Sequence, residues 1–245
     1  MEQKTLRDFV PGATRDAWNG PRRGTPRSLG LWAVASAAYG KIIFMNRPNL
    51  NCPNYNVVWV YTMITIRQLR YTDMAQAISL KKLCWPEELA GLSDVQLDSE
   101  REFSFWTAWM NAAQQNNDVR MLYGAFDGDE MLGVAFGSFV ESKNAPESGF
   151  ELNGLWVYPQ HRGKGVSLKL LLVMLDDFYR LGARQIVIYN FHFSSSNGFY
   201  RKFGCQVIGT EYQTEDHIPV DIFSCDIADM KSRIVESLAH IAAEI

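Results

Sequence analysis

The sequence predicts an α/β fold, a central mixed, mostly antiparallel β-sheet of about seven strands with helices on both faces. Three observations favour this fold class. Short apolar runs alternate along the chain with longer amphipathic segments, two apolar runs meet at an Asp127-Gly128 hairpin signal, and the run RQIVIYNF is typical of a buried central strand. With 245 residues, 47% of them hydrophobic, the chain has enough apolar surface for a substantial core.

The first part of the domain is predicted to form a strand, two helices and a hairpin. Hydrophobic residues alternate in the strand, and they recur among polar residues in the second helix. The predicted ranges are Ile64–Leu69 for the strand, Asp73–Cys84 and Asp98–Gln115 for the helices, and Val119–Phe126 with Met131–Glu141 for the hairpin. The stretch WPEELAGLSD between the two helices predicts a loop, because it is rich in helix breakers and acids.

The second part continues the sheet and adds three helices. A Leu-rich helix follows the next strand and is expected to end near Gly182, because glycine is the residue type common after a helix C-terminus. The other predicted elements are the strand Phe150–Tyr158, the strand RQIVIYNF, the short helix Ser195–Phe203, the strands Gln206–Glu211 and Pro219–Asp226, and the terminal helix Met230–Ala243.

Residues 1–62 differ from the rest in composition. They carry eight Lys and Arg residues against three acids, hold five of the nine prolines and show no sustained period. We interpret them as a poorly ordered or atypical N-terminal extension, with Met63 as a candidate natural start; an organelle-targeting peptide is the alternative. The predicted organisation is an extension over 1–62, a domain over 63–228 and a C-terminal helix over 229–245.

The composition also argues against several classes of binding partner. The net charge of −3 gives no basic field for nucleic acid, and no stretch reaches the roughly 18 apolar residues of a membrane span. The four cysteines show no CxxC spacing and the four histidines no HExxH spacing, so we expect no metal site. Widely spaced free thiols suit a reducing compartment, which predicts a cytoplasmic protein.

The stretch VYPQHRGKGVSLKLLLVML, residues 157–175, predicts an anion-binding turn at the start of a helix. A helix N-terminus leaves backbone N–H groups unbonded and carries a partial positive charge. Glycines let a ligand approach these groups, and Arg162 and Lys164 add charge beside them. The spacing is neither that of a Walker loop nor the full GxGxxG pattern. A turn that only needs glycine is the alternative, but the combination favours a pyrophosphate.

The strand before this turn changes its hydrophobic register. Phe150 and Leu152 alternate, and Leu155 and Val157 alternate, but the two pairs are out of step. One extra residue, Asn153 or Gly154, must therefore be absorbed as a bulge. A bulge bends a strand away from its neighbour, so it predicts either a harmless irregularity or a slot for an extended, amide-bearing ligand arm.

Tyr200 lies on the predicted short helix in SSSNGFYRKFGC and can point toward that slot. A phenol with a pKa near 10 is a feasible proton donor to a thiolate leaving group. Packing in the core is the alternative role for an aromatic residue there.

Two motifs and the order of elements carry a resemblance to a known family. Residues 157–171, VYPQHRGKGVSLKLL, match the pattern V-x-P-x-x-R-G-x-G, with Gln160, Gly163 and Gly165 as its [QR]-x-x-G-x-[GA] core. Residues 200–205, YRKFGC, are similar to Y-x-x-x-G-F, with Cys205 in place of the usual Phe. On these residues, and over about residues 63 to 226, the chain resembles the GNAT-type acyl-CoA N-acyltransferases.

The resemblance implies acetyl-CoA, or another acyl-CoA, as the donor. The pyrophosphate is then expected on the backbone amides of His161–Val166 and the pantetheine along Leu155–Val157, with Asn190 and Tyr200 on the far side. The implied donor-binding residues are Leu155, Trp156, Val157, Gln160, His161, Arg162, Gly163, Lys164, Gly165, Val166, Asn190 and Tyr200. The family also makes a homodimer one assembly to expect.

The implied chemistry is direct attack of an amine on the thioester. Tyr200 is expected to protonate the departing thiolate, and the backbone amides near Trp156 and Val157 to polarise the thioester carbonyl. Glu151, six residues before Val157, is the first candidate for the general base, and a water relay is the alternative proton acceptor. A solvent-facing strand acid is the alternative reading of Glu151.

The acceptor is expected to be a primary amine. The segments around the early helices and the late strands are rich in acids and would attract a cation. This favours a small cationic molecule, such as a polyamine or an aminoglycoside-type antibiotic; acetylation of such an antibiotic would give antibiotic resistance. The substrate-binding candidates are Trp85, Glu87, Trp106, Glu215 and Asp216. A protein or peptide N-acetyltransferase, a non-catalytic acyl-CoA sensor and a scaffold built on the basic head are the alternatives.

Overall fold

The computed structural model describes residues 64–89, 97–116, 118–140, 149–213 and 218–243. The helices and strands of these residues are as follows. The strands are β1 (Ile64–Gln68), β2 (Arg120–Asp127), β3 (Glu130–Phe139), β4 (Gly149–Val157), β5 (Gln185–Phe191), β6 (Gln206–Gln213) and β7 (Ile218–Asp226). The α-helices are α1 (Met74–Leu89), α2 (Ser99–Asn116), α3 (Val166–Arg180), α4 (Asn197–Lys202) and α5 (Ile227–Ala243).

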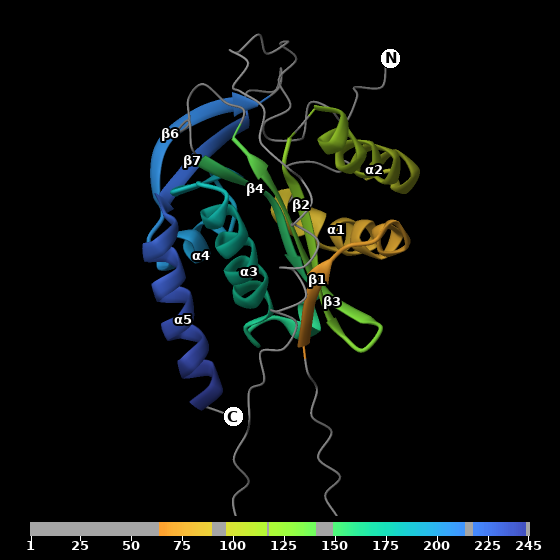
Figure 1. Ribbon diagram of the computed structural model, residues 1–245. Helices are drawn as coiled ribbons and strands as arrows, with labels where there is room; N and C mark the ends of the chain where they lie inside the picture. Colours follow the sequence, from red (N-terminus) through yellow and green to blue (C-terminus); the bar gives the residue numbers. More distant parts are fainter. Residues whose placement is uncertain (1–63, 90–96, 117, 141–148, 214–217, 244–245) are drawn as a thin grey trace, which may run out of the picture.

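The seven strands form one sheet in the order β1-β2-β3-β4-β5-β7-β6. Every neighbouring pair is antiparallel except β4 and β5, which are parallel. In Figure 1, α1 and α2 lie on one side of the sheet and α3 and α5 on the other. The mixed, mostly antiparallel sheet with helices on both faces confirms the predicted fold class.

The helix α1 corrects the prediction at its C-terminal end. The predicted helix ends at Cys84 and a loop follows, whereas α1 continues through Pro86 to Leu89. A proline inside a helix costs about 3 kcal/mol, because it removes a hydrogen bond and crowds the preceding turn. Long-range packing offsets that cost: Trp85 and Leu89 are buried against β5 and β7, and burying one leucine contributes about 1.5–3 kcal/mol.

The strand β4 carries the predicted bulge. Gly137 on β3 pairs with Leu152, but the next residue back, Phe136, pairs with Gly154, so Asn153 has no partner in the register. Phe150, Leu152, Leu155 and Val157 accordingly all contact the same core, between the sheet and α3. This confirms that the strand changes its register at the predicted place.

The parallel pairing of β4 and β5 is short. Only Gly149, Phe150 and Glu151 on β4 pair with residues of β5, ending at Val187. Toward their C-terminal ends the two strands diverge, which confirms the predicted splayed fourth strand and leaves a gap in the sheet.

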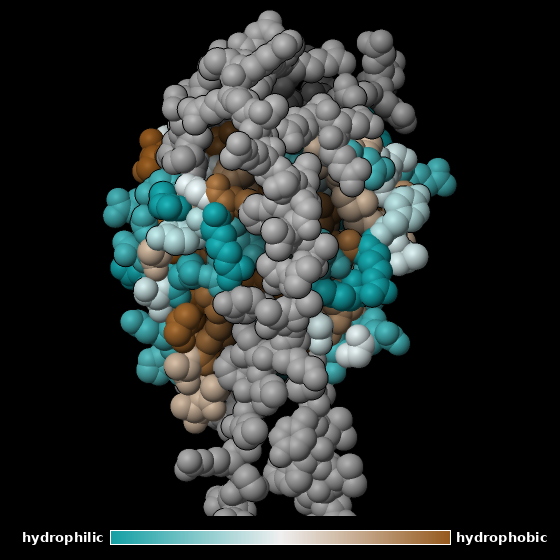
Figure 2. Space-filling model, viewed as in Figure 1, coloured by the Kyte–Doolittle hydropathy of each residue, from teal (hydrophilic) through white to brown (hydrophobic). Residues whose placement is uncertain are grey.

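The helix α5 begins earlier than predicted and belongs to the same core as α3. It starts at Ile227 rather than Met230, because the Asp226 carboxylate accepts hydrogen bonds from the amides of Ala228 and Asp229 at 2.7 and 3.2 Å. Its buried residues Met230 and Ile234 pack in the cluster that contains α3. The outer edge on the α5 side is mostly hydrophilic in the space-filling view (Figure 2).

Several expectations concern residues outside the described ranges. The N-terminal extension over 1–62, the candidate start at Met63 and the acids Glu215 and Asp216 are among them. These stay predictions. Within the described ranges, no helix is long and apolar enough to cross a membrane.

Candidate active site

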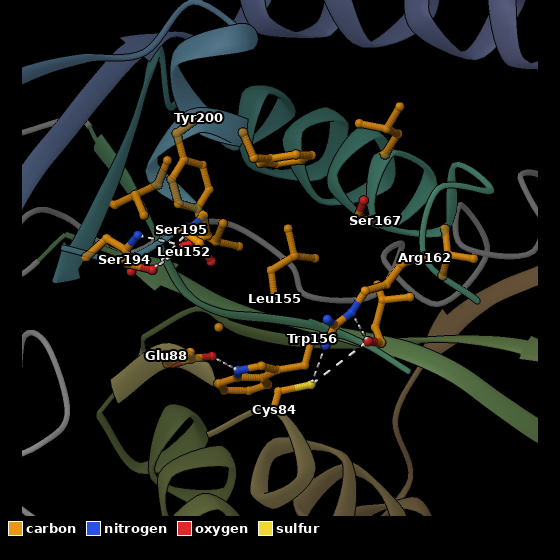
Figure 3. A pocket seen from close by; sticks show the side chains of 18 of the residues that line it. Cys84, Glu88, Leu152, Leu155, Trp156, Arg162, Ser167, Ser194, Ser195 and Tyr200 are labelled. Carbon is orange, nitrogen blue, oxygen red and sulfur yellow. Dashed lines mark hydrogen bonds between the residues drawn. The ribbon is translucent and has the colours of Figure 1, made fainter. Parts of the chain in front are cut away.

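A cavity of about 680 Å³ occupies the gap between β4 and β5. Leu152–Val157 of β4 line one wall and Ile188–Phe191 of β5 line the other. It continues to the turn before α3, passes α4, and reaches the last turn of α1 (Figure 3). The bulge and the short parallel pairing therefore open the sheet where the sequence analysis expected a slot.

The backbone polar groups on the β4 wall alternate in direction. Tyr158 N donates to Leu132 O of β3 at 3.0 Å, so the alternation of an antiparallel ladder turns the amide and carbonyl of Val157 away from β3. The contacts of the Val157 carbonyl agree: it accepts from Arg162 Nε at 3.1 Å. The same alternation turns the backbone groups of Leu155 toward the gap.

The turn at the end of β4 has the conformation that its glycines require. A one-turn 3-10 helix, η5 (Pro159–His161), leads to Gly163 and Gly165, whose φ angles are 74° and 76°. A side chain on Gly163 would meet nothing within 4 Å, so the space above that amide is open. A Cβ on Gly165 would lie 2.9 Å from Leu238 Cδ2, so this glycine also lets α5 approach.

The two basic side chains of the turn are held by protein groups. Arg162 Nη1 donates to Glu87 Oε2 at 2.7 Å, and Arg162 Nη2 to Cys84 Sγ at 3.5 Å, both on α1. Lys164 Nζ donates to Gln160 O at 2.9 Å. The Arg162 guanidinium therefore reaches across the mouth of the cavity to α1, and its role beside an anion stays a prediction.

Some backbone amides of this turn already donate hydrogen bonds within the protein. His161 N donates to Tyr158 O at 2.8 Å and Arg162 N to Pro159 O at 3.3 Å, within the 3-10 turn. The predicted cradle over His161–Val166 is therefore shorter, and it begins at Gly163. From there, the amides lead into the N-terminus of α3, where helix geometry supplies further unbonded N–H groups.

The opposite wall is fixed by two asparagines. Asn190 Nδ2 donates to Ser196 Oγ at 2.8 Å and to Asn197 Oδ1 at 2.7 Å. Asn197 Nδ2 in turn donates to the carbonyls of Phe191 and His192 at 3.0 and 2.9 Å. Asn190 lines the cavity, as predicted, but its side-chain nitrogen positions the turn that leads from β5 to α4.

Tyr200 of α4 lines the cavity and is 8% exposed. It packs edge-on against Phe199 and also contacts Phe223, and Figure 3 shows it beside Ser195 and Leu152. Burial, followed by the negative charge of Glu88, raises the pKa of the phenol above its usual value. The group is thus protonated at neutral pH, as a proton donor has to be.

Glu151 does not line the cavity. It is 2% exposed on β4, and its carboxylate accepts a hydrogen bond from Asn153 Nδ2 at 2.9 Å. Asn153 Oδ1 in turn accepts from Ser138 Oγ of β3 at 3.2 Å. The alternative reading of a solvent-facing strand acid is wrong, and the candidate base is separated from the cavity by Asn153, which does line it.

Glu88 is a cavity carboxylate that the sequence analysis counted only among the acids of the acid-rich segments, without a catalytic role. It lies on the last turn of α1 and accepts a hydrogen bond from the indole N–H of Trp156 on β4 (Figure 3). Burial raises the pKa of the Glu88 carboxyl, while the Trp156 bond and the Lys81 charge oppose the rise. Its position depends on the extension of α1 through Pro86.

Gly154 allows the indole of Trp156 to fold back over β4. A Cβ at Gly154 would lie 2.3 Å from Cη2 of that ring. The sequence analysis connected Gly154 only with the bulge, whereas the unpaired residue is Asn153. The glycine instead makes room for the ring that bonds Glu88.

A buried lysine sits among three tryptophans on the same side of the cavity. Lys81 Nζ lies 5.3, 5.3 and 5.7 Å from the ring centres of Trp85, Trp106 and Trp156. It donates to Glu102 Oε2 at 2.7 Å, and that oxygen also accepts from Trp106 Nε1 at 3.0 Å. Lys81 and all three indoles line the cavity, so this chamber holds an ammonium in an aromatic environment.

Three of the five candidate substrate-binding residues line the cavity. Trp85, Glu87 and Trp106 line the cavity, whereas Glu215 and Asp216 lie outside the described residues. Within the described part of the chain, the Trp85 indole N–H is buried without a hydrogen-bond partner. Other lining residues were given no role from sequence. Some lie outside any motif: Lys81, Cys84, Ser237, His240 and Ile241. Others lie in the stretch around Tyr200: Ser194, Ser195, Ser196, Phe199 and Lys202.

Much of the expected acidic surface is engaged within the fold. Asp98 accepts from the amide of Arg101 at the start of α2, and Asp221 lies 3.0 Å from a His192 ring nitrogen. Glu87 pairs with Arg162. Among the described residues, no group of three His, Cys, Asp or Glu side chains is arranged to hold a metal ion.

Solved structures share this fold at low sequence identity. PaiA N-acetyltransferase from Thermoplasma acidophilum, in complex with coenzyme A, is 20% identical with a TM-score of 0.51 over 66% of this chain and 98% of its own. Ribosomal-protein-alanine N-acetyltransferase from Brucella melitensis is 15% identical, with a TM-score of 0.51 over 66% and 98%. Phosphinothricin acetyltransferase from Sinorhizobium meliloti, in complex with AcCoA, is 16% identical, with a TM-score of 0.51 over 66% and 88%.

These likenesses concern the fold, and acetyltransferases named for different acceptors share it equally well. A search of curated proteins finds no match to the sequence. A family model does match: the model of the acetyltransferase (GNAT) domain covers residues 65–208, which include the splayed strands, the glycine turn and Tyr200. The chain belongs to the GNAT acetyltransferase family and is an acyl-CoA N-acyltransferase.

Proposed function

We propose that this protein transfers an acetyl group from acetyl-CoA to a primary amine by direct attack of the amine on the thioester. One observation carries the proposal. The gap between β4 and β5 runs without interruption into the turn at Gly163, so one cavity offers a strand edge and a helix N-terminus in series. Acetyl-CoA has the matching parts in the same order, an amide-bearing arm followed by a diphosphate.

The donor side of the cavity fits this molecule. Leu155 and Val157 direct backbone groups into the gap and would bond the pantetheine amides as a neighbouring strand does. The open space above Gly163 and the start of α3 would receive the diphosphate. The other donor-binding candidates, from Gln160 to Val166, shape this turn, and Asn190 holds the opposite wall.

The chain would promote the reaction in three ways. The Leu155 amide, turned into the gap farther from Gly163 than the Val157 amide, would stabilise negative charge on the thioester oxygen, an effect worth about 3–4 kcal/mol per donor in other enzymes. Tyr200 lines the cavity, and its phenol, protonated at neutral pH, would give its proton to the departing CoA sulfur. The cavity itself would hold amine and thioester in contact. Acetyl-CoA supplies the activated acyl group.

The acceptor we propose is a small cationic amine, such as a polyamine or an aminoglycoside. The three indoles and the Glu88 carboxylate that line the cavity support this, because indole faces and a carboxylate attract a cation, while the charge of Lys81 is offset by its ion pair with Glu102. The unpaired indole N–H of Trp85 offers one donor to an oxygen of the acceptor. A peptide N-terminus is the alternative acceptor. The homodimer and the cytoplasmic location stay predictions.

Binding and turnover test the proposal together. Isothermal titration of the full chain with acetyl-CoA should show saturable binding, and release of free CoA thiol should depend on an added amine. Spermidine, kanamycin, lysine and an alanine-starting peptide form the panel. Absence of acetyl-CoA binding contradicts the proposal. Binding without turnover on any amine of a widened panel favours the acyl-CoA sensor.

A further inference from the structure

Two carboxylates among the described residues line the cavity, Glu87 and Glu88. They differ in what holds them. The Glu87 carboxylate is 56% exposed and forms an ion pair with Arg162. The Glu88 carboxylate instead accepts a hydrogen bond from the uncharged indole N–H of Trp156, and no cation is bonded to it among the described residues. A proton acceptor needs this second arrangement, because a bonded guanidinium lowers the basicity of a carboxylate.

Glu88 also lies at the reacting end of the cavity. Trp156, which bonds it, directly follows Leu155, whose amide faces the gap. On the other side, Glu88 lies close enough to Tyr200 for its charge to act on the phenol. Figure 3 shows Glu88 beside the indole on the α1 side and Tyr200 on the α4 side of the pocket. An amine placed to attack the thioester from the α1 side would therefore meet Glu88.

We propose that Glu88 is the general base that accepts the proton of the amine, in the place assigned from sequence to Glu151. This inference rests on the acetyl transfer proposed above. Glu88 opens on the cavity, whereas the Glu151 carboxylate is buried behind Asn153. A group that takes a proton must come within hydrogen-bond reach of it, directly or through one water, and of the two carboxylates only Glu88 lines the cavity, so position favours Glu88.

The step balances in protons and bonds. The acceptor enters as an ammonium with three protons, and the amide product keeps one. Glu88 takes the first proton and passes it to water, which leaves a lone pair on the amine. The amine nitrogen bonds to the carbonyl carbon as the bond from carbon to sulfur breaks. The second proton replaces the one that Tyr200 has given to the CoA sulfur.

The charges around Glu88 fix the direction of its pH dependence. Burial raises the pKa of its carboxyl and Glu87 adds to the rise, while Trp156 and Lys81 lower it, and the net effect is upward. The nearby thiol of Cys84 and the phenol of Tyr200 both have raised pKa values and stay neutral near pH 7. Glu88 must be ionised to act, so the rate should fall as pH falls through its raised pKa.

The main experiment compares three variants of the full chain with the wild type. Glu88→Gln keeps an acceptor for the Trp156 bond but cannot take a proton. Glu151→Gln tests the alternative base, and Glu236→Gln, on the exposed face of α5, is the matched control. We measure acetyl-CoA affinity by titration and kcat against pH with the best amine of the panel.

The expected result is a loss of about 100-fold in kcat for Glu88→Gln, which is typical of general-base removal. The fall of kcat at low pH, called here the acid limb of the profile, should be absent from this variant. Its affinity for acetyl-CoA should be unchanged. Glu236→Gln should match the wild type. If Glu88→Gln keeps both its rate and its acid limb while Glu151→Gln loses them, the inference is overturned. If the wild type fails to bind acetyl-CoA, the proposed function itself has failed.

A second measurement does not need turnover. With carboxyl-labelled glutamate, the ¹³C resonance absent from Glu88→Gln reports the pKa of Glu88 directly. The double variant Lys81→Met/Glu102→Gln removes the buried ion pair together, so no unpaired charge remains. Loss of the Lys81 charge should raise the pKa of Glu88 and move the acid limb of kcat to higher pH. If the pKa read from the ¹³C resonance of Glu88 rises but the acid limb of kcat stays at the same pH, the acid limb belongs to another group. That result contradicts the inference.

Discussion

The two ends of the cavity are built in different ways. At one end, the turn with Gly163 and Gly165 is specified by residues close together in the chain. Both glycines have positive φ angles, which glycine adopts without strain. At the other end, the last turn of α1 depends on partners far along the chain: Trp156 is 68 positions from Glu88, and Arg162 is 75 positions from Glu87. The first end can be recognised in a short motif, while the second exists only once the sheet has formed.

This difference suggests a division of labour between the two ends. In the proposed function, the local turn would serve the donor, acetyl-CoA. The α1 end, assembled by long-range contacts, would face the acceptor, and the two acetyltransferases of this fold compared above are named for different acceptors. Variants at each end should therefore affect different kinetic constants.

Tyr200→Phe should have an effect on kcat as large as that of Glu88→Gln, and larger than that of the variants that follow. Phenylalanine keeps the packing against Phe199 and Phe223 but has no proton to give to the CoA sulfur. We expect kcat to fall by about 100-fold with little change in acetyl-CoA affinity. Steady-state kinetics and titration calorimetry check this. An unchanged rate at saturating substrates removes Tyr200 from the acid role.

Gly163→Ala should weaken the donor end alone. Alanine resists the φ of 74°, with a strain of about 1–2 kcal/mol, so the amides that follow should lose their alignment. We expect acetyl-CoA affinity to fall by about tenfold and kcat at saturation to change little.

The matched control for this variant is Gly128→Ala in the hairpin. Gly128 has a φ of 59° and open space around it, so alanine introduces similar backbone strain away from the cavity. Thermal melts should show comparable destabilisation in the two variants. An equal loss of acetyl-CoA affinity in both would mean that the glycine turn has no special part in binding the donor.

Removal of the ion pair between Arg162 and Glu87, which joins the two ends of the cavity, should have the smallest effect of these changes. Because both side chains are substantially exposed, a double-mutant cycle with Arg162→Gln and Glu87→Gln should give a coupling of about 0.2–1 kcal/mol in unfolding free energy. The two single variants should change acetyl-CoA affinity alike. A much larger loss for Arg162→Gln would place its charge on the diphosphate, as the sequence analysis expected.

The sequence predicted the fold and the opening in the sheet well because their signals are local. The change of hydrophobic register around Asn153 follows from the two-residue period of a strand, and the hairpin at Gly128 from turn chemistry. The position of Arg162 was missed, since no local pattern says whether a guanidinium points at a ligand or at a neighbouring helix.

The acceptor end could not be predicted for a related reason. Pro86 and two acids in WPEEL favour a loop locally, but burial of Trp85 and Leu89 extends α1 through them. Glu88 thereby reaches the cavity. Glu151 has the right place in the sequence of β4, yet its side chain is bonded to Asn153. Only tertiary packing distinguishes the two carboxylates.

A crystal structure of the full chain with bound coenzyme A tests the central claim most directly. The account predicts the pantetheine arm between β4 and β5, bonded to the backbone of Leu155 and Val157, with the diphosphate on the amides from Gly163 onward. Coenzyme A bound elsewhere, with the two strands closed against each other, would contradict it.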